Sequence, residues 1–323
     1  MLNNISSSYI TKIIFSYLGT EQTLKIVKYN KILQNKLDIH IIDYRLYSGK
    51  YIIYESEKYA KEYFTYNDNL MYEGEYLNGK RNGKGKEYDE YSGNLKFVGE
   101  YLDGKRNGAC KEYYKKGELK FEGEYLSGKK WNGKVYDPSN YNIYQLTNGE
   151  GLIKEYNNLK TLIFEGEYKN GERNGKGKEY SSIDGTLSFE GEYLDGKRNG
   201  KGKEYNYQKL LIFEGEYLNG KRWNGIGYDI SNNNSSYVLK NGKGLVKESN
   251  FQVEFYNGEK NGKGKFFSEG RLLFEGEYKN GQKNGKGKEY NSEGEVIFEG
   301  EYENNHKIKG RSFIAKRLEF EGE

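Results

Sequence analysis

The sequence contains few of the residues that catalytic sites, metal sites and disulfide-stabilised domains require. Its 323 residues include one cysteine, two histidines and one proline. Because Cys110 is alone, no intrachain disulfide and no cysteine zinc site can form. His40 and His306 lie far apart in the sequence, and no serine, cysteine or carboxylate completes a recognisable catalytic pattern with either one. We therefore expect a protein that is not an enzyme and that holds no metal ion or cofactor.

Long hydrophobic runs are also absent. The apolar run Ile13-Ile14-Phe15 is too short for the core of a signal peptide or for a membrane span. Residues 1–4 lack the basic start of a signal peptide. We expect an intracellular, cytoplasmic protein.

No excess of one charge sign is present. The chain has 52 basic and 48 acidic residues, a formal net charge of +4. Nucleic-acid-binding domains usually concentrate basic charge on one face, whereas glutamates flank every basic segment of this chain. The balance argues against a nucleic-acid partner.

Aromatic residues and glycine are abundant instead. The chain has 34 tyrosines, 15 phenylalanines and 43 glycines, although hydrophobic residues make up only 34% of it. Disordered chains are poor in aromatic residues, so this composition predicts an ordered but thin structure without a deep core. Tyrosine suits such a structure because its ring can be buried while its hydroxyl stays in water.

A short motif recurs along the chain. An aromatic residue followed by x-Gly-Glu-Tyr begins at Tyr72, Phe97, Phe121, Phe164, Phe189, Phe213, Phe274 and Phe298. Neighbouring copies lie 24 or 25 residues apart, and a glycine-rich basic segment such as residues 78–85 usually follows. Trp131 and Trp223, 92 residues apart, mark longer variant units that predict interruptions in the array. A fixed period of this kind indicates one supersecondary unit stacked on its own copies.

Each unit reads as a β-hairpin. Alternation in residues 121–125 places Phe121, Gly123 and Tyr125 on one face of a strand and both glutamates on the other. The following Asn and Gly residues supply the positive φ angles of a turn, and residues 84–88 read as the returning strand. The strand glycines leave room for an aromatic ring from a neighbouring unit to lie across the backbone.

The predicted fold is therefore mainly β: an elongated, single-layer antiparallel meander of repeated hairpins. Residues 51–323 form this array, and residues 1–50 form a small α-helical module. Apolar residues at helical spacing predict one helix that includes Ile5, Ile10 and Leu18, and a second over residues 21–37. In the second helix the residues expected to face inward are Leu24, Val27, Ile32 and Leu33.

The recurring motif resembles the MORN repeat, in which Tyr/Phe-x-Gly-x-Tyr/Trp precedes a turn with Gly-x-Gly and a strand. The resemblance extends from about Met71 to the C-terminus. It implies a twisted single-layer sheet with a grooved face that serves as a scaffold or interaction module, and some such proteins have been proposed to bind phosphoinositides or membranes. Residues 13–18, with Leu24 and Val27, resemble an F-box module, which would imply a ubiquitin-ligase substrate adaptor.

Two sets of residues are candidate binding sites. We expect a protein partner to contact the aromatic face through Tyr76, Tyr101, Tyr125, Tyr168, Tyr193, Tyr217 and Tyr278. As an alternative, anionic membrane lipid would contact the basic turns through Lys80, Arg81, Lys105, Arg106, Lys197 and Arg198.

Two further patterns have simpler interpretations. Paired glutamates such as Glu73 and Glu75 recur in almost every unit and are interpreted as a solvated strand face. Repeated Gly-Lys-Gly segments lie between strands, as hairpin turns do, and not between a strand and a helix as in a phosphate loop. The sequence does not fix the oligomeric state.

Overall fold

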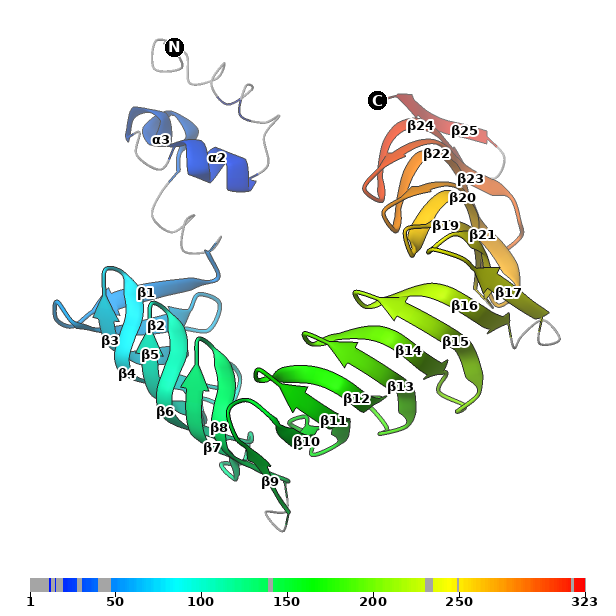
Figure 1. The fold of residues 1–323 in the computed structure, drawn as a ribbon. Helices are drawn as coiled ribbons and strands as arrows, with labels where there is room; N and C mark the ends of the chain where they lie inside the picture. The colour runs from blue at the N-terminus through cyan, green and yellow to red at the C-terminus, as the bar shows by residue number, and fades with distance from the viewer. Residues whose placement is uncertain are drawn as a thin grey trace. The chain divides into compact units, whose positions relative to one another are not determined.

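The computed structural model describes residues 12, 15, 20–27, 31–39, 48–138, 142–229, 235–248, 250–314 and 317–322 (Figure 1). Contacts divide the chain into two compact units, Met1–Asn142 and Ile143–Glu323. The boundary expected near residue 50 from composition stays a prediction. Among the described residues, no helix has the length and apolarity needed to cross a membrane.

In the described part of unit 1 two helices have defined bounds, α2 (Thr20–Val27) and α3 (Lys31–Leu37), and Lys12 and Phe15 are also helical. Leu33 of α3 packs with Phe15 in a small apolar cluster, and Leu24 of α2 is also buried. Ile32, expected to face inward, is 54% exposed, so that assignment was wrong. The predicted first helix, apart from Lys12 and Phe15, lies outside the described residues, as do His40 and the side chain of Val27.

The strands of unit 1 follow one another in sequence order in one antiparallel sheet, here called the first sheet. They are β1 (Lys50–Tyr54), β2 (Tyr59–Phe64), β3 (Leu70–Leu77), β4 (Lys80–Tyr88), β5 (Leu95–Leu102), β6 (Lys105–Tyr113), β7 (Leu119–Leu126) and β8 (Lys129–Tyr136).

Unit 2 opens with β9 (Ile143–Leu146) and contains two eight-stranded sheets, again in sequence order. The second sheet has β10 (Gly151–Tyr156), β11 (Leu162–Lys169), β12 (Glu172–Tyr180), β13 (Leu187–Leu194), β14 (Lys197–Tyr205), β15 (Leu211–Leu218), β16 (Lys221–Asp229) and β17 (Ser235–Leu239). The third sheet has β18 (Gly244–Glu248), β19 (Phe251–Tyr256), β20 (Glu259–Ser268), β21 (Arg271–Lys279), β22 (Gln282–Tyr290), β23 (Val296–Glu303), β24 (His306–Ile314) and β25 (Arg317–Gly322).

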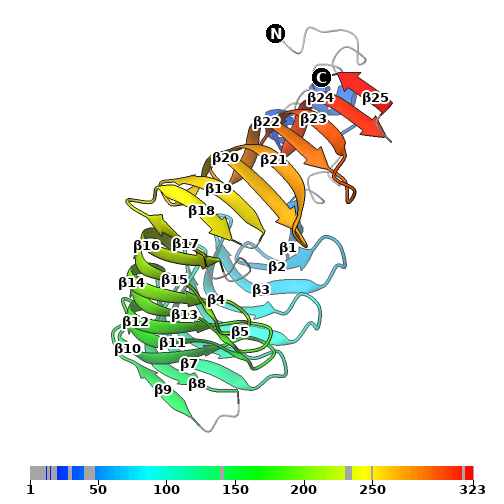
Figure 2. The same ribbon diagram turned by 90° about the vertical axis from the view of Figure 1, so that its right-hand side faces the viewer.

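This arrangement confirms the predicted fold class, a mainly β protein built from an antiparallel meander of hairpins. Within each sheet the strands are bent, so that the single layer curves (Figure 2). One sheet ends and the next begins just after each Trp-containing hairpin, β7–β8 and β15–β16. The interruptions predicted from Trp131 and Trp223 are therefore present.

The hairpin turns are shorter than the basic segments suggested. Two residues such as Asn78-Gly79 or Asp103-Gly104 form each of these turns, and both residues have positive φ. These angles are those of a type I′ turn, which matches the twist of the flanking strands. Lys80 and Arg81 are already the first two residues of β4. The prediction that placed them in the turn was wrong, because two residues are enough to reverse the chain.

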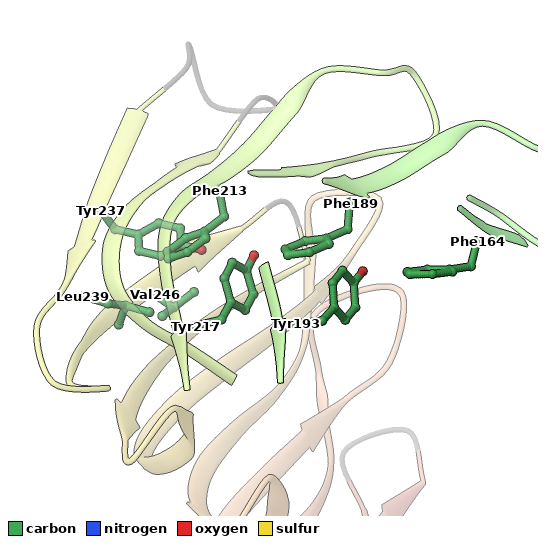
Figure 3. Packing of buried hydrophobic residues seen from close by; sticks show 8 residues of the cluster. All are labelled: Phe164, Phe189, Tyr193, Phe213, Tyr217, Tyr237, Leu239 and Val246. Atoms are coloured by element: carbon green, nitrogen blue, oxygen red, sulfur yellow. The ribbon is translucent and has the colours of Figure 1, made fainter. Parts of the chain in front are cut away.

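Buried rings form the core of each sheet. Phe164, Phe189 and Phe213 are fully buried in the second sheet, and tyrosines lie between them (Figure 3). The ring centroids of Phe189 and Tyr217, from successive hairpins, are 5.0 Å apart at an interplanar angle of 83°. This edge-to-face geometry is favourable for aromatic pairs. Stacking of rings between hairpins therefore joins one repeat to the next.

The strand glycines lie under these rings. A Cβ atom built on Gly177 would lie 2.6 Å from the Phe164 ring, in the same hairpin, and 3.2 Å from Tyr193 of the next. The expected cover by a neighbouring unit's ring is thus only part of the arrangement. The phenylalanine of a hairpin covers its own glycines, and the tyrosine of the next hairpin packs against that phenylalanine in an edge-to-face contact.

Candidate functional site

The two faces of each sheet differ in chemistry. We call the side that carries the Phe and Tyr of the motif the aromatic face, and the side that carries its two glutamates the charged face. The strands alternate between them as predicted: Phe189 and Tyr193 are buried, whereas Glu192 between them is exposed. The two faces are therefore separate candidate binding surfaces.

The tyrosines of the aromatic face are interior residues. Tyr101 is 4% exposed, and its hydroxyl donates to the carboxylate of Glu87 on the preceding hairpin at 2.6 Å. Of the seven predicted partner-binding tyrosines, five are buried and two are half-buried; the buried ones are Tyr76, Tyr101, Tyr125, Tyr193 and Tyr217, and the half-buried ones are Tyr168 and Tyr278. They join the hairpins and present little ring surface to a partner. Their role in binding stays a prediction.

The arginines cover this face. The Arg106 guanidinium lies 3.9 Å from the centroid of the Phe97 ring and bonds to Glu87 and Glu112, each at 2.5 Å. Burial alone would lower the pKa of Arg106, but its bonds to Glu87 raise the pKa above its usual value. Arg81 and Arg198 repeat the arrangement over Tyr72 and Phe189, each at 4.1 Å.

The six basic residues predicted to bind anionic lipid therefore separate into two groups. Arg81, Arg106 and Arg198 are held in ion pairs with glutamates inside the sheet. Lys80, Lys105 and Lys197 are exposed at the start of their strands. Only the lysines are presented to an anion outside the sheet, and lipid binding itself stays a prediction.

Two buried glutamates are held in their ionised form by the basic residues around them. Burial opposes ionisation of Glu62, but hydrogen bonds from Arg81, Lys50 and Tyr76 outweigh it and bring its pKa to about 2. Burial likewise opposes ionisation of Glu112, and the charges of Lys130 and Arg106 hold its pKa at about 2. Ion pairs thus cover the aromatic face, and its side chains hold the sheet together.

On the charged face, side chains of opposite charge alternate from strand to strand. In the second sheet the successive cross-strand partners are Lys154, Glu165, Lys178, Glu190, Lys203 and Glu214. Lys154 and Glu165 form an ion pair at 3.0 Å, as Lys203 and Glu214 do at 3.3 Å. These side chains form a regular row across the sheet.

The glutamates of this face are fixed by further contacts. The hydroxyl of Tyr180 donates to Glu165 at 2.6 Å, and that of Tyr205 donates to Glu190 at 2.8 Å. The second glutamate of the motif has a different task, because Glu192 accepts the backbone N–H of Lys201 at 3.0 Å where β14 bulges. The carboxylates are therefore preorganised, whereas the side chains of Lys176 and Lys201 extend into solvent.

A groove runs across the charged face of the second sheet. It has a volume of about 920 Å³, and its lining includes five lysines and six glutamates from β10 to β15. The third sheet repeats it with a groove of about 820 Å³, lined in part by Lys263, Lys265, Glu275 and Glu277. Both grooves are thus lined by nearly balanced charge around backbone glycines.

Comparison with known families agrees with the hairpin geometry. The model described as MORN repeat matches six segments of the chain, residues 72–90, 97–118, 164–186, 189–206, 254–270 and 274–296. The chain contains MORN repeats. A search of curated proteins found no match. The MORN repeat is a non-enzymatic module that typically binds proteins or membranes.

The matched segments correspond to hairpins: residues 189–206, for example, include most of β13 and all of β14. The two Trp-containing hairpins are not among the matches, although they form the same structure. The bulge is shorter there, and an asparagine side chain bonds to the second glutamate: Asn132 donates to Glu124 at 3.1 Å and Asn224 donates to Glu216 at 2.7 Å. MORN geometry therefore extends beyond the segments in which its sequence pattern is clear.

The MORN resemblance implied a grooved face, but sequence reasoning did not place the groove on the charged face or find its lining of lysines and glutamates. Paired glutamates were interpreted as a solvated strand face, and the lysines as parts of turns. The signal that could have shown the groove was the alternation of Lys-x-Lys and Glu-x-Glu on successive strands, which places opposite charges side by side.

Proposed function

We propose that this protein is a non-enzymatic interaction or scaffold protein that holds a protein partner in the grooves of its charged face. The observation that carries the proposal is the groove of about 920 Å³ on the second sheet, with its ordered rows of lysine and glutamate. A groove of this kind offers both charge signs at regular spacing, which favours a polypeptide that carries both signs itself.

The charge of the groove argues for protein over anionic lipid. Its lining has one more glutamate than lysine, so the field over it is not positive. Anionic head groups bind where basic residues accumulate. Several glutamates are also held in place by Tyr and backbone donors, which keeps their charge at the surface. A protein with basic and acidic side chains meets these conditions.

Charge reversal in the groove tests the proposal. Lys176→Glu with Lys201→Glu changes two exposed lysines of the lining and leaves the aromatic face intact. Full-length wild type and variant, each carrying an affinity tag, are used to capture proteins from the native cell, followed by quantitative mass spectrometry. The partner is expected among proteins that the groove variant loses.

A matched variant controls for charge alone. Lys169→Glu with Lys209→Glu makes the same change at two exposed lysines outside the groove lining, one at the end of β11 and one in the loop after β14. This variant is expected to retain the partner. Equal capture by wild type and both variants would contradict groove binding.

Two other functions implied by the MORN and F-box resemblances stay predictions. Flotation of the full chain with anionic vesicles tests lipid binding, which would show as association that salt removes. Capture of a ubiquitin-ligase scaffold by the full chain, and its loss after changes in α2 and α3, would support an adaptor function.

A further inference from the structure

A row of exposed leucines lies on the first sheet, separate from the grooves described above. Leu77, Leu102 and Leu126 are the last residues of β3, β5 and β7, and they are 55%, 53% and 45% exposed. Each follows the buried tyrosine of its motif, so strand alternation places all three on the charged face. They recur once per hairpin beside the two-residue turns. We call them the leucine row.

The leucine row coincides with departures from the repeat. In unit 1, Val98 stands where unit 2 has Glu190, and Ala109 stands where unit 2 has Lys201. Val98 is half-buried on β5, the strand that ends at Leu102, and Ala109 is exposed on β6, which pairs with β5. Two charged side chains are therefore replaced by apolar ones on the charged face of the hairpin that carries Leu102. This makes the charged face of the β5–β6 hairpin more apolar than that of the β13–β14 hairpin.

Lysines border the row. Leu77 is the cross-strand partner of Lys80, Leu102 of Lys105, and Leu126 of Lys129. Lys80 and Lys105 are exposed, and Asp103 lies 3.7 Å from the Lys80 ammonium. An apolar row with a basic border is complementary to a ligand that has an apolar stripe with acidic neighbours.

The spacing of the leucines matches the repeat of an α-helix better than that of an extended strand. Successive hairpins are two strands apart, which is about 9.6 Å. An α-helix rises about 10.5 Å in seven residues. Apolar residues seven positions apart on a helix therefore match the spacing of the leucines to within about 1 Å per step. An extended strand would bring an apolar residue to this face every ~6.8 Å and would lose register at the second leucine.

We propose that the leucine row docks an acidic amphipathic α-helix of a partner protein, with its axis along the row and perpendicular to the strands. About 13 residues of helix span the three leucines. Acidic side chains beside its apolar stripe face Lys80, Lys105 and Lys129. This surface is independent of the groove proposed above, because it lies in the other unit and its residues do not line either groove.

Selection of peptides tests the proposal even while the partner protein is unidentified. A display library of random 20-residue peptides is selected on the full-length wild-type chain and counter-selected on Leu77→Ser with Leu102→Ser and Leu126→Ser. The enriched peptides are expected to share large apolar residues seven positions apart with Asp or Glu beside them. In fluorescence anisotropy, such a peptide should bind the triple variant about tenfold more weakly or worse. Lys80→Glu with Lys105→Glu should weaken it as well.

Leu194→Ser with Leu218→Ser is the matched control. These leucines occupy the same repeat position in the second sheet, where the β13–β14 hairpin keeps the charged residues Glu190 and Lys201. The control should bind the peptide as wild type does, and all variants should keep the wild-type circular-dichroism spectrum because the changed leucines are about half exposed.

Several results would overturn the proposal. One is that no enriched peptide distinguishes wild type from the triple variant, and another is that the peptides carry apolar residues at every second position. A third is binding of phosphatidylserine vesicles in place of peptide, with loss in the triple variant. A fourth is a wild-type dimer in sedimentation that the triple variant lacks, since the row would then be covered by a second copy.

Discussion

The arginine near the start of the second strand of a hairpin connects several strands. Arg106, on β6, bonds to Glu87 of β4, covers Phe97 of β5 and bonds to Glu112 of its own strand. A cation over an aromatic ring contributes about 0.5–2 kcal/mol. Loss of one partner from a buried ion pair costs more, because the remaining charge is left unpaired. This single side chain therefore ties one hairpin to the hairpin before it.

The first prediction compares two basic residues of β6. Arg106→Met should destabilise the first sheet by about 1.5–3 kcal/mol in urea unfolding, because half-buried Glu87 and buried Glu112 lose a charged hydrogen-bond partner, although Glu87 keeps Arg81 and Glu112 keeps Lys130. Lys111→Met removes an exposed ion pair with Glu122 on the charged face and should change the stability much less. Equal losses in the two variants would show that Arg106 is not a structural clamp.

Acid should unfold the first sheet through its buried carboxylates. The pKa values of Glu62 and Glu112 are about 2 in the folded chain, below the ordinary value of 4.5. Between these values the unfolded chain binds more protons than the folded one, so stability should fall as the pH drops from about 4.5 to about 2. Urea unfolding at a series of pH values measures this slope.

Glu62→Gln is the control for that measurement. The variant lacks one of the two titrating groups, so it should be less stable at neutral pH and should lose less stability between pH 4.5 and pH 2. An unchanged slope would mean that other groups control acid unfolding.

The positions and contacts of single side chains were only partly predictable from the sequence. Alternation within the motif placed Phe, Gly and Tyr on one face because strand geometry is local. The arginines were read as turn residues, since the sequence around residues 78–85 looks like one long turn. Their partners, such as Glu62 for Arg81, are 19 positions away on another hairpin. A long flexible side chain gives no local sign of such a contact.

At the scale of one hairpin, a glycine and a glutamate specify the bulge in the second strand. Gly200 of β14 has a φ of 94°, and a Cβ atom there would collide with the Glu192 carboxylate that caps the bulge. The same pairing of a positive-φ glycine with a glutamate recurs at Gly108 and Glu100, and at Gly285 and Glu277. Glycine is required there both for the backbone angle and for the space.

Gly200→Ala should therefore cost about 2 kcal/mol or more in denaturant unfolding, since strain at positive φ adds to displacement of the cap. Gly196→Asn is its partner experiment. Gly196 also has positive φ, but nothing lies near its Cβ position, and asparagine tolerates this conformation in a type I′ turn. That variant should lose less than about 1 kcal/mol. A larger loss at Gly196 than at Gly200 would contradict the assigned role of the bulge.

Hairpins were the most predictable level of structure. Asn-Gly and Asp-Gly between alternating strands specify a tight turn, and Asn78-Gly79 and Asp103-Gly104 form one. The bulge was not predicted because it depends on a glutamate from the facing strand, as at Glu192 and Lys201.

At the scale of a whole unit, polar contacts connect the second and third sheets. Arg222 of β16 bonds to Glu204 of β14 at 2.8 Å and also to Glu248 of β18. The turn residue Gly242 donates to the carbonyl of Trp223 at 2.8 Å and accepts from Gly258 at 2.9 Å. The turns thus continue to stack where the strand pairing stops, and the sheets of unit 2 are coupled through this junction.

Arg222→Met should weaken that coupling. In differential scanning calorimetry we expect the variant to broaden or split the unfolding transition of unit 2, because each sheet then depends less on its neighbour. Arg198→Met, which removes the ion pairs with Glu179 and Glu204 inside the second sheet, should lower the transition temperature without splitting it. Identical profiles for the two variants would argue against a junction held by Arg222.

The division into sheets was visible in the sequence only as longer units after Trp131 and Trp223. Their lengths showed that the repeat was disturbed there. They did not show that strand pairing ends near Leu146 and Leu239, because pairing depends on contacts between residues that are distant in sequence. The grooves follow from uninterrupted runs of paired strands, so they too could not be located from one repeat alone.

Lysine footprinting of the chain with its captured partner tests groove binding most directly. An amine-reactive reagent and mass spectrometry report how much each lysine is protected when the partner binds. We expect protection at Lys176, Lys178 and Lys201 in the groove of the second sheet, and unchanged labelling at Lys209 in the loop after β14. Unchanged labelling of the three groove lysines, with protection confined to lysines elsewhere, would contradict the account.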